Sequence, residues 1–94
     1  MIIAVDIGNS DVVIGIFNDE KLLQSWRLRT IIQQSLNEYE IQLRGMLFAC
    51  DFSVKETKGA VLSSVVPELT DLFTQLIENI IGQRPIKVSN ELNL

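Results

Sequence analysis

The sequence predicts an α/β domain with a mixed five-stranded sheet, the element order β-β-β-α-β-α-β, and helices on the faces of the sheet. Three observations lead to this prediction. Two apolar runs, residues 2–7 and 12–17, flank a connection so short that they must pair antiparallel. Apolar residues then recur at helical spacing in two segments, which begin near residues 35 and 67. An apolar run at 59–66 separates these segments, so each helix is expected to cross between strands with the usual right-handed connection.

The first three strands are predicted to form an antiparallel meander. The run at 2–7 is almost continuously apolar, which is typical of a strand buried on both faces. Residues 17–21 are rich in turn formers and predict a second reversal. The third strand, 21–30, alternates better and is predicted to be an edge strand with one wet face. Its two faces are expected to carry Leu22, Trp26 and Leu28 on one side, and Leu23, Ser25, Arg27 and Arg29 on the other.

The first helix is predicted over 35–50. Ser35 and Glu38 have the spacing of a capping box, in which each side chain binds the backbone N–H of the other residue. Cys50 ends the apolar stripe of this helix. It is expected to be a small buried hydrophobic residue.

The second helix is predicted to begin at Pro67, because a fixed φ and a missing N–H suit the first helical position. It is predicted to end at Gly82, a residue type that favours the position after the last helical turn. A short fifth strand is predicted at 84–89, and residues 90–94 resemble an unfinished continuation.

Composition restricts the possible functions. The 94 residues suit one small domain, and the net charge of −4 without a basic cluster argues against a nucleic-acid partner or an anionic membrane surface. The absence of histidine excludes Ser-His-Asp and Cys-His catalysis and most zinc sites. A single cysteine rules out an internal disulfide. With no signal peptide and no membrane-spanning stretch in the sequence, we expect a soluble cytoplasmic domain.

The stretch DIGNSD, between the first two strands, combines groups suited to a metal-bound phosphate. Gly8 permits a positive φ and a close ligand approach, and exposed turn amides donate to phosphate oxygens. Asn9 and Ser10 add side-chain donors, while Asp6 could hold Mg²⁺ directly or through water. The alternative is an ordinary hairpin turn, since Gly, Asn and Ser are common turn residues. Spacing alone leaves both interpretations open.

Ser63 and Ser64 end the fourth strand, where the ends of sheets often meet ligands. They are therefore possible cleft residues, although Ser64 could instead satisfy nearby backbone groups. Arg27 and Arg29 are interpreted as solvated edge charges rather than as ligand contacts.

Four stretches together resemble the type III pantothenate kinases. They are DIGNSDVVIG, LLQSWRLRT, SLNEYEIQL and VLSSVVPELT, in this order. That family belongs to the superfamily of acetate and sugar kinases, Hsp70 and actin. The resemblance therefore implies a ribonuclease H-like, actin-like ATPase fold.

The resemblance implies ATP-dependent phosphorylation of pantothenate to 4′-phosphopantothenate, the first step of coenzyme A synthesis. It also implies Mg²⁺, a monovalent cation (K⁺ or NH₄⁺) and a homodimer in the complete enzyme. Asp6 matches the acidic residue of the family at the metal and phosphates. Gly8, Asn9 and Ser10 match its phosphate loop.

The sequence also departs from the pattern of the family. Asp11 stands where a neutral polar residue is usual, and a carboxylate facing a triphosphate would repel it. The G-x-D-R segment with the proposed catalytic aspartate of the family has no counterpart. We therefore expect 1–94 to be a single N-terminal domain without the second domain of the family, inactive alone. Two alternatives remain: a non-catalytic interaction module, or another superfamily member such as a sugar kinase or an actin-like filament protein.

Overall fold

The computed structural model describes residues 1–89, and the predicted continuation at 90–94 lies outside the described residues. Five strands and two α-helices follow one another in the predicted order. A short 3₁₀-helix, η1, also lies in the connection before the fourth strand. The elements are β1 (Ile2–Ile7), β2 (Asp11–Asn18), β3 (Lys21–Arg29), α1 (Leu36–Ala49), η1 (Val54–Glu56), β4 (Gly59–Ser64), α2 (Pro67–Ile81) and β5 (Ile86–Lys87).

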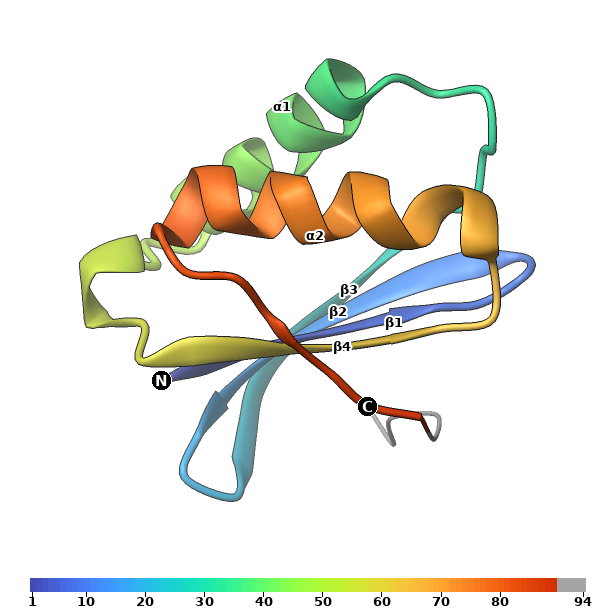
Figure 1. Cartoon of the computed structure of the whole chain (residues 1–94). Helices are drawn as coiled ribbons and strands as arrows, with labels where there is room; N and C mark the ends of the chain where they lie inside the picture. Colours follow the sequence, from blue (N-terminus) through green and yellow to red (C-terminus); the bar gives the residue numbers. More distant parts are fainter. Residues whose placement is uncertain (90–94) are drawn as a thin grey trace.

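The sheet has the strand order β3-β2-β1-β4-β5 (Figure 1). β2 pairs antiparallel with both β1 and β3, whereas β4 pairs parallel with β1 and β5. The predicted mixed sheet is thus confirmed. Because β1 and β4 are parallel neighbours, their carboxyl ends meet at one edge of the sheet, beside the turn that leads into β2.

Both helices cover the same face of the sheet, above the strands in Figure 1. The two crossovers, from β3 to β4 and from β4 to β5, advance in the same direction across the sheet. Two right-handed connections that advance in one direction place their helices on one side. We call this side the helix face and the other side the open face. The helix face is lined by Ile3, Val5, Ile7, Val12, Ile14, Ile16, Ala60 and Leu62, all buried.

The helix ends follow the sequence signals. Ser35 Oγ accepts the Glu38 N–H at 3.2 Å, and the Glu38 carboxylate accepts the Ser35 N–H at 3.3 Å, so the capping box is confirmed. Pro67 occupies the start of α2, and Gly82 ends it in the left-handed conformation with a φ of 78°. The two helices pack through their aromatic residues. The ring centroids of Tyr39 and Phe73 lie 4.9 Å apart.

Two local predictions were wrong. Cys50 is exposed rather than buried, because α1 ends at Ala49 and the chain turns away through Asp51, which has a φ of 59°. On β3, the register shifts at a bulge opposite Ile16. Leu23 consequently lines a hollow together with Ile16 of the helix face, instead of lying with Ser25 on the wet face.

No helix in the described part of the chain is both long and apolar enough to cross a bilayer.

Candidate functional site

The turn between β1 and β2 projects from the edge at which β1 and β4 end. The Gly8 N–H donates to the Asp11 carbonyl oxygen at 2.9 Å and closes this turn. Asn9 and Ser10 form its exposed tip. Within residues 1–89, their backbone N–H groups donate to no backbone carbonyl oxygen. The exposed tip therefore carries two N–H groups that no backbone oxygen accepts, and turn amides of this kind are suitable donors to a phosphate group.

Gly8 does not use the positive φ that glycine permits. Its φ lies outside the left-handed region, and Gly82 is the only described glycine within it. A β-carbon at position 8 would lie 3.1 Å from the Asp11 carbonyl oxygen, the atom that accepts the Gly8 N–H. Glycine thus relieves a close contact at the hydrogen bond that closes the turn.

Asp6 and Ser63 are neighbours in register on adjacent strands, on the open face. Asp6 is half-buried and Ser63 is buried. Ser64 points to the other side, where its hydroxyl accepts the Val66 N–H at 3.1 Å and the Thr70 hydroxyl at 2.9 Å. The structure therefore brings Asp6 and Ser63 together, while the Ser64 hydroxyl binds groups at the start of α2.

Asp11 has a partner on the neighbouring strand. Its carboxylate lies 3.3 Å from the Arg27 guanidinium, and both side chains are largely exposed. The guanidinium offsets the negative charge that would otherwise repel a phosphate at the adjacent turn. Arg27 therefore provides an ion pair to the turn, whereas Arg29 lies exposed at the end of β3.

The start of α2 lies at the same edge. The Val65 N–H donates to the Ile7 carbonyl oxygen at 3.0 Å and so ties the β4–α2 connection to the end of β1. A hollow of about 260 Å³ opens between the turn and this connection. It is lined by Asn9, Thr30, Ile31, Ile32, Gln33 and Val66. The exposed turn thus borders a concave surface rather than standing alone in solvent.

Thr30 is a residue of this site that the sequence reasoning missed. Its N–H donates to the Ser10 carbonyl oxygen at 2.9 Å, and its hydroxyl donates to the Gly8 carbonyl oxygen at 2.7 Å. Thr30 follows Arg29, which pairs with Asp11 across the antiparallel strands, so the register of β2 and β3 brings Thr30 to the turn. That register includes a shift between Ile16 and Phe17, which the alternation of residues 21–30 did not indicate.

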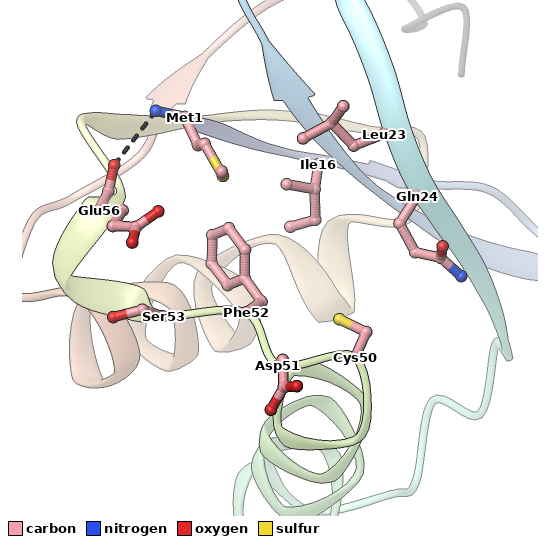
Figure 2. A pocket seen from close by; sticks show the side chains of 9 residues that line it. All are labelled: Met1, Ile16, Leu23, Gln24, Cys50, Asp51, Phe52, Ser53 and Glu56. Carbon is pink, nitrogen blue, oxygen red and sulfur yellow. Dashed lines mark hydrogen bonds between the residues drawn. The ribbon is translucent and has the colours of Figure 1, made fainter.

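A second hollow, of about 220 Å³, lies at the opposite end of the sheet, where β1 begins (Figure 2). Met1, Ile16 and Phe52 give it an apolar interior, and the carboxylates of Asp51 and Glu56 lie at its rim. No Lys or Arg lines it. An acidic rim is unsuited to an anion such as a nucleotide phosphate, so the turn remains the better candidate.

Comparison with known proteins identifies relatives along the whole described chain. A family model described as type III pantothenate kinase matches residues 2–94. The chain is 36% identical over 88 residues to a type III pantothenate kinase of Moorella thermoacetica, and this match covers 94% of the chain and 35% of the relative. It is 38% identical over 87 residues to one of Dehalococcoides mccartyi, covering 93% of the chain and 33% of the relative.

A solved structure has the same fold. It belongs to a protein from Porphyromonas gingivalis assigned as an N-acetylglucosamine kinase, with a TM-score of 0.67 and 20% identity. The match covers 95% of this chain and 34% of that one. The likeness shows a shared fold, in agreement with the predicted ribonuclease H-like, actin-like ATPase fold. In each of these comparisons, the chain spans about a third of the length of the protein that it matches.

Proposed function

Because the chain belongs to the type III pantothenate kinase family, we propose that its complete protein transfers the γ-phosphoryl group of ATP to pantothenate. The product is 4′-phosphopantothenate, the first intermediate of coenzyme A synthesis. The observation that carries the proposal is the coincidence of the family match with an exposed turn that follows β1, the strand that contains Asp6. The chain supplies part of the phosphate site and is inactive alone.

Phosphoryl transfer depends mainly on positioning the phosphates and offsetting their charge. In this proposal, the N–H groups of Asn9 and Ser10 and the two side chains bind phosphate oxygens. Gly8 keeps the turn closed, and Arg27 offsets the charge of Asp11. The catalytic base lies in the second domain, which relatives of about three times this length have room for.

Asp6 has the right chemistry to hold Mg²⁺, because Mg²⁺ prefers oxygen ligands and is commonly bound by one or two carboxylates together with substrate phosphates. Within residues 1–89, no group of three or more His, Cys, Asp or Glu side chains could hold a metal ion. The proposed role of Asp6 is therefore to bind the ion, directly or through water, only together with ATP. Bound Mg²⁺ would offset charge on the phosphates.

The remaining features are proposed from the family. They are a monovalent cation (K⁺ or NH₄⁺), a homodimer, and a cytoplasmic location in which the exposed Cys50 thiol stays reduced. Ser63, beside Asp6 in register, is proposed to lie in the cleft.

The test uses a chimera in which this chain replaces the matched segment of the Moorella thermoacetica relative. We expect the chimera to phosphorylate pantothenate with ATP, and Asp6→Asn to lower kcat/KM at least about a hundredfold, as loss of a key electrostatic group does. Asp19→Asn is the matched control. Asp19 is exposed in the β2–β3 turn with a φ of 56°, a conformation that asparagine also adopts.

A folded chimera without pantothenate phosphorylation would contradict the proposed function. Full activity in the Asp6→Asn chimera would contradict the role of Asp6. If the chain instead serves as a non-catalytic interaction module, the folded chimera will bind no ATP.

A further inference from the structure

We infer that Thr30 is a positioning residue that holds the Gly8–Asp11 turn in the shape required for phosphate binding, and that Tyr39 holds Thr30 in place. The inference rests on the proposed function, because it assigns a control element to the same phosphate site. A continuous set of hydrogen bonds runs from the core of the molecule to the exposed turn.

Thr30 donates hydrogen bonds to the turn on both sides of its tip. The hydroxyl donates to the Gly8 carbonyl oxygen at 2.7 Å, and the N–H donates to the Ser10 carbonyl oxygen at 2.9 Å. These two carbonyl groups flank Asn9. A trans peptide unit directs its C=O and its N–H in opposite directions. Both carbonyl oxygens are directed toward Thr30, so the N–H groups of the same two peptide units point away from Thr30. These N–H groups belong to Asn9 and Asp11.

Tyr39 anchors the segment that contains Thr30. Its ring is fully buried against Phe73 on the helix face. Its hydroxyl accepts the Ile31 N–H at 2.8 Å and lies 3.0 Å from the Ile31 carbonyl oxygen and 3.3 Å from that of Arg29. A single buried hydroxyl thus binds the backbone on both sides of Thr30. A buried polar group with satisfied partners keeps one geometry, because losing these partners costs free energy.

The arrangement connects the core to the site. Helix α1 positions Tyr39, Tyr39 positions the backbone at 29–31, and Thr30 positions the turn. The turn itself has a single internal backbone hydrogen bond, between Gly8 and Asp11. The two bonds from Thr30 therefore add one restraint on each side of the exposed tip.

The test compares Thr30→Val, which removes the hydroxyl at nearly constant shape, with Thr30→Ser, which retains it. Thr57→Val is the matched control, because the Thr57 hydroxyl is buried without a hydrogen-bond partner at the other end of the sheet. In the 94-residue chain, we expect Thr30→Val to speed amide exchange of the Gly8 N–H about three- to tenfold, the range for loss of one neutral hydrogen bond. Thr30→Ser and Thr57→Val should leave this rate near its original value.

In the chimera, Thr30→Val should raise KM for ATP by a similar factor, with kcat and KM for pantothenate unchanged. General destabilisation would instead lower kcat by reducing the active fraction. Tyr39→Phe should act in the same direction as Thr30→Val on both exchange and KM for ATP. This second variant keeps the test valid if one substitution disturbs folding.

The outcomes separate the two proposals. If Thr30→Val speeds exchange at Gly8 but the folded parent chimera phosphorylates no pantothenate, the proposed function is wrong and control of the turn by Thr30 is supported. If the parent chimera is active and Thr30→Val leaves either Gly8 exchange or KM for ATP unchanged, the inference is overturned. Failure of Thr30→Ser to restore both values would also overturn it.

Discussion

At the scale of single residues, Gly8 shows how the absence of a single atom, the β-carbon, makes room for a tight turn. The sequence places glycine in a turn, and turn glycines usually supply a positive φ. Here the reason is space, because a β-carbon would lie 3.1 Å from the carbonyl oxygen that accepts the N–H of the same residue. That oxygen cannot retreat without lengthening the hydrogen bond that closes the turn.

Gly8→Ala should therefore lower the free energy of unfolding by about 1–2 kcal/mol, the usual range for added volume at a tight site. Gly45→Ala is the matched control. Gly45 lies inside α1, and a β-carbon added there would meet nothing beyond the backbone of its own helix within 4 Å. It should raise the free energy of unfolding by about 0.5–1 kcal/mol, the gain of Ala over Gly in a helix. Urea denaturation followed by circular dichroism measures both, and equal effects at the two positions would contradict the steric explanation.

The electrostatic effect of a charged residue near the turn also depends on its neighbours. Asp11 is an unfavourable residue beside a phosphate when it is considered alone. The antiparallel pairing of β2 and β3 brings Arg27 within 3.3 Å of it. This ion pair could not be predicted from the sequence, because the two residues lie 16 positions apart and the bulge near Phe17 changes the register of the strands.

At the scale of elements, α1 and α2 are joined by polar contacts as well as by their core residues. Glu40 on α1 accepts hydrogen bonds from the Asn79 amide of α2 at 3.1 Å and from Arg44 at 2.8 Å. The Asn79 hydrogen bond, followed by those of Arg44, lowers the pKa of Glu40 below its ordinary value of 4.5. The folded state therefore binds this proton more weakly than the unfolded state does.

It follows that Glu40 contributes stability above its unfolded pKa and loses the contribution as the pH falls through its lower, folded pKa. Glu40→Gln should reduce the free energy of unfolding near neutral pH by no more than about 1 kcal/mol, because the contacts lie at the surface, where solvent screens them. The difference from the parent chain should shrink in acid. Chemical denaturation across this pH range measures it, with Glu20→Gln in the β2–β3 turn as the control. A difference that grows in acid would contradict the assignment.

At the scale of the whole molecule, the two faces of the sheet differ sharply. The helix face is covered by α1 and α2, whereas no described helix covers the open face (Figure 1). The open face carries half-buried Val13 and Val61 and exposed Val65 and Ile86, the last two with 47% and 68% of their surface accessible. Apolar surface of this kind favours association.

We therefore expect the 94-residue chain to self-associate with increasing concentration, and Ile86→Lys to raise the dissociation constant about tenfold, the effect of exposing one buried aliphatic side chain. Phe48→Lys is the control. Phe48 is 85% exposed on α1, away from the open face. Sedimentation equilibrium measures the constants. Loss of association in Phe48→Lys, with Ile86→Lys unchanged, would place the contact on α1 instead.

The sequence was sufficient for most features that depend on short separations along the chain. Hydrophobic period, caps and turn residues act within a few positions, so the order of the elements, the Ser35 capping box and the ends of α2 could be predicted from them. The resemblance to a kinase family also came from short stretches, and the family match over residues 2–94 agrees with it.

Contacts between distant positions depended on the three-dimensional arrangement. The placement of both helices on one face follows from the direction in which the crossovers advance, and the Asp11–Arg27 pair follows from strand register. The bonds from Thr30 to the turn and from Tyr39 to Ile31 likewise join elements that only folding brings together. Local patterns therefore indicated the turn residues and Asp6 of the candidate site, but not Thr30. Packing between elements determined which atoms hold those groups in place, because hydrogen bonds and ion pairs act over a few ångströms in space and not along the chain.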